Sequence, residues 1–138
     1  MKQSFAYQIS ALRRDFTIFC DKALEEMELS KGLMFFVLYI GKHESCSLGE
    51  LALALRMDPG HTTRSIDKLV KKGFVQKERA KFDKRSQELI LTKKGKEVFK
   101  KIYLLFEEWD EKILKNLEEQ ELEQFKCILN KIIEAQSV

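Results

Sequence analysis

The fold of this chain is decided by residues 58–92, which have the sequence DPGHTTRSIDKLVKKGFVQKERAKFDKRSQELILT. The stretch begins with Asp58, a favoured N-cap, and Pro59, which loses no hydrogen bond at the first helical position. We expect a helix from Pro59 that ends at Gly73, since glycine readily adopts the left-handed conformation that closes a helix. Two short strands, residues 74–79 and 87–91, should follow, joined by a polar, basic tip. A helix followed by a hairpin is therefore the centre of the predicted fold.

Long helices are predicted on both sides of this centre. Apolar residues recur every three or four positions in residues 4–27, which indicates one amphipathic helix. Ser30 should cap a second helix over the apolar run 33–40, and the Ser-x-x-Glu capping box at 47–50 should begin a third that reaches residue 55 and buries Leu51, Ala52 and Leu55. Thr92 should cap a helix to about residue 117, with Trp109 and Ile113 on its inner face, and a last helix should cover about 119–135.

The predicted fold class is mainly α with a small β-hairpin wing, a winged helix-turn-helix at 47–92 flanked by long terminal helices at 4–27 and 92–136 in a single domain, 1–138. The longest apolar run has eight residues, far fewer than the roughly 20 that cross a bilayer, and the N-terminus has no secretory pattern. Three cysteines without a CxxC pair fit a reducing compartment. We expect a cytoplasmic protein without a membrane partner.

The net charge of +3 is unevenly distributed along the chain. Residues 1–55 have a net charge of −1 and residues 102–138 one of −5, whereas residues 56–101 contain fifteen basic and six acidic side chains, a net charge of +9. A concentrated positive block is typical of a polyanion-binding module, although a solvated lysine-rich surface would look the same.

The predicted helix from Pro59 has two chemically different faces. Thr62, Ile66, Leu69 and Val70 should pack inward. The outward face should carry His61, Arg64, Lys68 and Lys71, with Ser65 among its small polar neighbours. A helix of this width fits the major groove of B-DNA, where its N-terminal turn usually contacts the bases. The candidates are Gly60, His61, Thr63 and Arg64 for base edges, and Lys68 and Lys71 for phosphates.

The hairpin that follows strengthens the case for DNA because its basic residues crowd arms and a tip where nothing needs burying. An arginine at the tip, Arg85, can reach an adjacent minor groove, whose negative potential attracts it. Asp83 is placed to pair with Arg85 and hold its guanidinium in one orientation. The wing candidates are Arg79, Lys81, Asp83, Lys84 and Arg85.

These motifs resemble the pattern of the MarR family of regulators over essentially the whole chain. The resemblance rests on Leu69-Val70-Lys71-Lys72-Gly73-Phe74-Val75, on Asp83-Lys84-Arg85 and on Leu91-Thr92-Lys93-Lys94-Gly95. It implies a homodimer with one winged module per subunit, the helix from Pro59 in the major groove, Arg85 in the minor groove and Asp83 as its orienting partner. The Met57-Asp58-Pro59-Gly60 start departs from the run of Ser, Arg and Thr found in many members.

We therefore expect a DNA-binding transcriptional regulator, a repressor that binds a pseudo-palindromic operator as a homodimer and is released by a small-molecule or redox signal. Apolar stripes on the terminal helices, too wide for the wing domain to cover, independently favour dimerisation. A small aromatic effector is a candidate partner, since family members often bind one near aromatic residues. The alternative is a helical dimer that docks an acidic protein through the basic block.

Catalytic and metal chemistry are not predicted. The sequence has no nucleophile–base pair, phosphate loop or metal quartet, so we expect neither an enzyme nor a cofactor. His43 and Cys46 have a His-x-x-Cys spacing but no second pair nearby, and a polar turn explains them better. Cys20 could sense peroxide, but burial as a small apolar side chain is the simpler interpretation.

Overall fold

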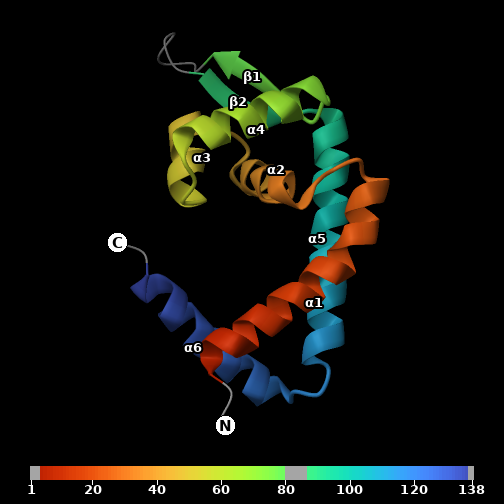
Figure 1. The fold of residues 1–138 in the computed structure, drawn as a ribbon, viewed down its shortest axis with the longest axis vertical. Helices are drawn as coiled ribbons and strands as arrows, with labels where there is room; N and C mark the ends of the chain where they lie inside the picture. The colour runs from red at the N-terminus through yellow and green to blue at the C-terminus, as the bar shows by residue number, and fades with distance from the viewer. Residues whose placement is uncertain (1–3, 80–86, 137–138) are drawn as a thin grey trace. The chain divides into compact units, whose positions relative to one another are not determined.

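The computed structural model describes residues 4–79 and 87–136. These residues form helices and one antiparallel hairpin, as the sequence predicts (Figure 1). The elements are α1 Phe5–Glu26, α2 Lys31–His43, α3 Leu48–Ala54, α4 Pro59–Lys71, β1 Val75–Arg79, β2 Gln87–Leu91, α5 Lys93–Leu114 and α6 Glu119–Ala135. Two compact units are present, one ending at Leu105 within α5 and the other beginning at Phe106.

The core of the first unit is organised around α2, which contacts α1, α3, α4 and β2 (Figure 1). Its apolar run buries Phe36, Val37 and Ile40 completely, which confirms that this run is a core helix. Side chains of α4, of the hairpin and of the turn between them complete the core, among them Ile66, Leu69, Phe74 and Leu89, all fully buried. Because α2 meets four elements, it fixes α4 and the hairpin relative to each other.

The predicted cap residues precede their helices, but the side chain of Ser30 forms no capping hydrogen bond to α2. The Ser47 hydroxyl accepts from the Glu50 amide at 3.1 Å while the Glu50 carboxylate accepts from the Ser47 amide at 3.3 Å, so the capping box is complete. The third helix ends one residue early, at Ala54, which leaves Leu55 half-buried rather than buried. Leu51 and Ala52 are buried as predicted.

Gly73 closes α4 in the left-handed conformation, with φ of 85°. The Gly73 amide donates to the Val70 carbonyl at 3.0 Å and the Phe74 amide to the Leu69 carbonyl at 2.9 Å, which is the Schellman arrangement. Phe74 is therefore part of the helix closure, and strand β1 begins one residue later than predicted, at Val75.

The hairpin pairs Val75 with Leu91 and Arg79 with Gln87 at the two ends of its register. Leu89 and Leu91 face the core, as their alternation with Glu88 and Ile90 predicts. A further bridge was not predicted: Cys46 exchanges two backbone hydrogen bonds with Leu89, at 3.2 and 2.7 Å. The segment before α3 is thus attached to the hairpin, and Cys46 lies buried in that attachment.

The second unit contains the end of α5 and all of α6. Helix α5 ends at Leu114, earlier than predicted. Ile113 was expected on the inner face of this helix, but it is 38% exposed in the single chain, so that prediction is wrong. None of the residues Glu119–Ala135, all of which are described, is buried. Within 4–79 and 87–136, the helices are all too short or too polar to cross a bilayer.

Candidate nucleic-acid interface

The first turn of α4 is held by Asp58. Its carboxylate accepts from the His61 amide at 3.0 Å, and its carbonyl accepts from the Thr62 hydroxyl at 3.0 Å. Gly60 has no side chain to crowd this turn. A Cβ at this position would lie only 3.2 Å from Nη1 of Arg64 and 3.0 Å from the Asp58 carboxylate. The Arg64 guanidinium therefore lies beside the Gly60 backbone, at the N-terminal end of the exposed face.

The buried face of α4 is rotated relative to the prediction. Thr62, Ile66 and Leu69 are buried as expected. Val70, expected to be inside, is 36% exposed, whereas Ser65, expected among the outward residues, is 5% exposed. A small serine fits where the helix lies against its neighbours, and the larger Val70 is left at the edge of the contact.

The opposite face brings together every residue predicted for the major-groove helix. All of its members are exposed, and they are Gly60, His61, Thr63, Arg64, Lys68 and Lys71. The Thr63 hydroxyl donates to the Pro59 carbonyl at 3.0 Å, and the His61 ring lies 6.4 Å from the Phe36 ring of α2. These contacts leave the cations of this face exposed along about three turns of helix, an arrangement that is suited to a polyanion.

Three other lysines of the basic block, residues 56–101, form contacts within the fold instead of facing a ligand. The Lys72 ammonium donates to the Glu28 carbonyl at 3.0 Å, and the Lys77 ammonium pairs with the Asp67 carboxylate at 3.1 Å. The Lys94 ammonium donates to the Lys72 carbonyl at 2.9 Å and lies 4.5 Å from the centre of the Phe74 ring. The net charge of the block thus overstates how many of its cations are available to a ligand.

The wing candidates are only partly within the described residues. Arg79 ends β1 and is exposed, so it lies where the prediction places it. Lys81, Asp83, Lys84 and Arg85 lie outside the described residues, and the proposed pairing of Asp83 with Arg85 stays a prediction. The Asp67–Lys77 ion pair joins α4 to the hairpin arm that carries Arg79.

The Leu-Thr-x-x-Gly motif forms the junction between this module and α5. The Thr92 hydroxyl donates to the Gly73 carbonyl and accepts from the Gly95 amide, and the Thr92 amide donates to the Phe74 carbonyl at 3.0 Å. A Cβ at Gly95 would collide with the Phe74 carbonyl oxygen, so only glycine permits this approach. The motif therefore positions the end of α4 against α5.

Two of the three cysteines are poorly suited to redox chemistry. Burial raises the pKa of Cys20 to about 11, with the Asp21 charge acting in the same direction, and burial raises that of Cys46 to about 11 as well. The reactive thiolate is therefore scarce at neutral pH. His43 stacks on Tyr39 at 4.1 Å between ring centres, and across the described residues no three His, Cys, Asp or Glu side chains converge as a metal site.

A hollow of about 310 Å³ lies between α1 and α2. Its lining combines the aromatic rings of Phe16 and Phe35 with the cations Arg13 and Lys31. Lys31 is also paired with Asp21 at 3.4 Å, and Cys20 forms part of the wall. Rings beside cations suit a small aromatic anion.

Comparisons with known proteins agree with this arrangement. The MarR family model matches residues 25–87. The chain is 46% identical over 132 residues to the HTH-type transcriptional regulator BilQ of Clostridium symbiosum, covering 96% of this chain and 92% of that protein. Among solved structures, a MarR protein from Peptoclostridium difficile matches with a TM-score of 0.88 and 28% identity, covering 99% of this chain and 90% of that one.

A second solved structure bears on the fold. A putative MarR family regulator from Listeria monocytogenes, described as complexed with 26mer DNA, has a TM-score of 0.88 and 23% identity, covering 99% of this chain and 91% of that one. A likeness at 23% identity establishes only the fold, which is the winged helix. The bound DNA is a property of the Listeria protein.

Proposed function

The chain belongs to the MarR family of transcriptional regulators, and on this premise we propose that it is a cytoplasmic repressor that binds an operator as a homodimer and leaves it when a small molecule binds. As a regulator of this family it is not an enzyme. The observation that carries the proposal is the exposed face of α4, where a histidine, an arginine and two lysines lie along one line of the helix.

The residues of α4 divide by position. Gly60, His61, Thr63 and Arg64 belong to the first turns, which approach base edges when a recognition helix enters the major groove end-first. Arg64 is the strongest candidate for base recognition, because a guanidinium can donate two hydrogen bonds to guanine. Lys68 and Lys71 lie further along and would neutralise phosphates.

The wing completes the proposed interface. Arg85 would enter the minor groove with Asp83 orienting it, while Arg79, Lys81 and Lys84 would contact the backbone. The Asp67–Lys77 pair supports this role because it connects the wing arm to α4. Two grooves of one duplex would then be contacted by elements whose relative position is fixed.

The homodimer is supported by apolar surface on the terminal helices. Phe5, Ile9 and Leu12 on α1 are each about half exposed, and α6 exposes Phe125, Ile128, Ile132 and Ile133. Isolated apolar side chains are normal on a surface, but regularly spaced rows of them usually mark a partner. We propose that residues 1–138 act as one domain whose terminal helices pair with those of a second copy, so that two α4 helices meet a pseudo-palindromic site.

The α1–α2 hollow is the proposed effector site. An aromatic acid could stack on Phe16 and Phe35 and pair with Arg13. We favour a small molecule over a redox signal at Cys20 or Cys46, because burial raises the pKa of each thiol to about 11 and keeps it protonated at neutral pH. Binding between α1 and α2 would act on the helix that supports α4.

The test measures binding of the purified protein to duplex DNA from upstream of its own gene by fluorescence anisotropy over a range of salt. We expect affinity to fall steeply with salt and Arg85→Ala to weaken binding strongly. Lys100→Ala, an exposed lysine of α5 outside the interface, is the matched control and should bind as the parent does. If neither this duplex nor random DNA is bound at low salt, the proposal is wrong and an acidic protein partner becomes the explanation of the basic block.

A further inference from the structure

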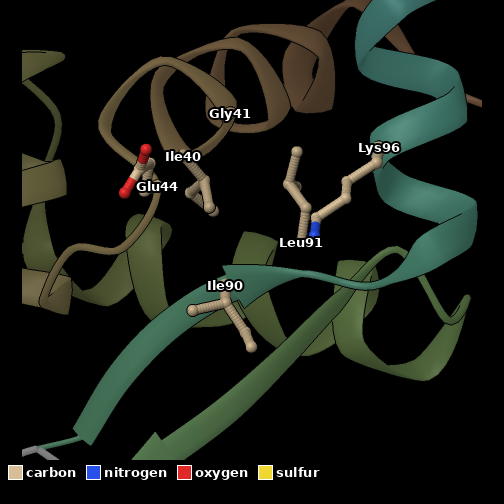
Figure 2. A pocket seen from close by; sticks show the side chains of 6 residues that line it. All are labelled: Ile40, Gly41, Glu44, Ile90, Leu91 and Lys96. Carbon is tan, nitrogen blue, oxygen red and sulfur yellow. The ribbon is translucent and has the colours of Figure 1, made fainter.

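A second hollow, of about 400 Å³, lies between the end of α2, strand β2 and the first turn of α5. Six residues line it, namely Ile40, Gly41, Glu44, Ile90, Leu91 and Lys96 (Figure 2). None of them belongs to the exposed face of α4 or to the α1–α2 hollow. The hollow is therefore separate from both surfaces assigned above.

The middle of this hollow is apolar. Ile40 from α2 and Leu91 from β2 project toward the same space and form its apolar floor, and both are buried, with exposures of 0% and 6% (Figure 2). Beside them Gly41 packs directly on the Phe99 ring, where a Cβ would collide, so α2 and α5 are in close contact next to the hollow. The floor of the hollow is therefore preformed and apolar, but it offers a ligand little contact area of its own.

The two ends of the hollow carry opposite charges, Glu44 at the end of α2 and Lys96 in the first turn of α5, with Ile40 and Leu91 between them (Figure 2). Each charge stands at the unfavourable end of its own helix, since a helix dipole favours cations at the C-terminus and anions at the N-terminus. The first turn of α5 contains no acidic residue. Lys42 and His43 do offset the dipole in the last turn of α2, but neither lines the hollow.

Glu44 is also held in a rare conformation. Its φ of 61° places a non-glycine residue in the left-handed region, which is energetically costly. Within 4–79 and 87–136, neither Glu44 nor Lys96 forms an ion pair. The hollow thus has an anionic end and a cationic end, each reinforced by a helix dipole and neither neutralised by a partner in those residues.

We propose that this hollow binds a small zwitterion whose ammonium and carboxylate groups are separated by an apolar chain, the chemistry of an ω-amino acid. The carboxylate pairs with Lys96 at the start of α5, the ammonium pairs with Glu44 at the end of α2, and the methylene groups cross the apolar floor between them. An α-amino acid without a charged side chain does not suit this site, because its ammonium and carboxylate groups are attached to the same carbon and cannot span the apolar middle.

Such a ligand would act on the wing. Cys46, two residues after Glu44, is hydrogen-bonded through its backbone to Leu89 of β2, and Leu91 of the same strand lines the hollow. Binding would join the end of α2, β2 and α5 through one molecule, which should restrict movement of the hairpin relative to α2.

The experiment titrates the full-length protein with 6-aminohexanoate, using 4-aminobutanoate and 8-aminooctanoate to vary the chain and hexanoate and hexylamine to supply each charge alone. Backbone amide NMR shifts report the site and calorimetry the affinity. We expect shifts at residues 40–44, 90–91 and 96, and an affinity for the best zwitterion about tenfold or more above that for either singly charged compound.

Glu44→Gln and Lys96→Gln should each lower that affinity by about tenfold. Lys101→Gln, an exposed lysine on another side of α5, should leave it unchanged. Equal binding of hexanoate and 6-aminohexanoate, shifts confined to other residues, or no shift at millimolar ligand would each overturn the proposal. These readouts need no DNA, so their failure is distinct from failure of the proposed repressor function.

Discussion

Helices α4 and α6 are both amphipathic, yet they use their apolar faces differently. Helix α4 buries Ile66 and Leu69 completely within its own chain and exposes a cationic face. Helix α6, described along its whole length, buries none of its residues and exposes Phe125 and Ile128. The same periodicity therefore indicates an intramolecular contact in one helix and, we propose, an intermolecular one in the other. Sequence pattern alone does not distinguish these cases, because it reports a face and not its partner.

The strongest test of this difference places a charge in the apolar row of α6. Phe125→Asp should prevent dimerisation, since an unpaired carboxylate would have to be buried in the interface. DNA affinity should then fall by about 10²- to 10⁴-fold, because each half-site would be bound without the second. Sedimentation velocity reports the dimer and anisotropy the affinity.

Asn130→Asp is the matched control, because it adds the same charge to the same helix away from the apolar row. It should remain dimeric and bind DNA normally. A Phe125→Asp protein that stays dimeric would show that α6 is not the contact between copies.

The contact between the end of α4 and α5 within one chain is tested at Gly95. Gly95→Ala forces a Cβ against the Phe74 carbonyl oxygen, a backbone atom that cannot turn away. We expect about 3 kcal/mol of lost stability, the upper part of the usual cost of overpacking, measured by urea unfolding. Gly49→Ala is the control, since its Cβ would meet only the Ser47 hydroxyl oxygen at 3.9 Å. Similar stability in the two variants would contradict the close approach at Gly95.

The exposed face of α4 is tested by comparing two of its cations. Arg64→Ala should cost about 1–3 kcal/mol on the operator and relax the preference at one base position. Lys68→Ala should weaken binding about equally on all sequences and reduce the dependence on salt by about one phosphate contact. Anisotropy on the operator and on single-base variants separates the two outcomes. A uniform loss for Arg64→Ala would assign that residue to a phosphate.

The helix boundaries could be predicted from sequence because the signals that set them are local. Asp58, Pro59 and Gly73 act within one turn of themselves, so the limits of α4 follow from chemistry visible in the sequence. The exposure of the six major-groove candidates on α4 also followed from its periodicity, whereas Ser65 and Val70 departed from it. The role of Arg85 was inferred from its charge at the hairpin tip and from resemblance to a family, and it stays a prediction because Arg85 lies outside the described residues.

What could not be predicted depends on residues distant in sequence. Ser65 is buried and Val70 exposed because the neighbours of α4 determine which edge of its apolar stripe is covered. The Cys46–Leu89 bridge is an isolated pair without the alternation that marks a strand. Lys72 bonds to Glu28, 44 positions away, so no local pattern shows that its charge is engaged.

The smallest expected effect concerns how firmly α4 is tied to the wing. Lys77 pairs with Asp67 at 3.1 Å, and the two side chains are 31% and 58% exposed, so the pair should contribute only about 0.2–1 kcal/mol to stability. Loss of the pair should change the free energy of DNA binding by more than that value only if the pair sets the distance between α4 and the wing. We therefore predict that Asp67→Asn and Lys77→Met are non-additive in operator binding, and that a duplex too short to reach the wing loses this coupling. Additive effects in a double-mutant cycle would mean that α4 and the hairpin contact DNA independently of this pair.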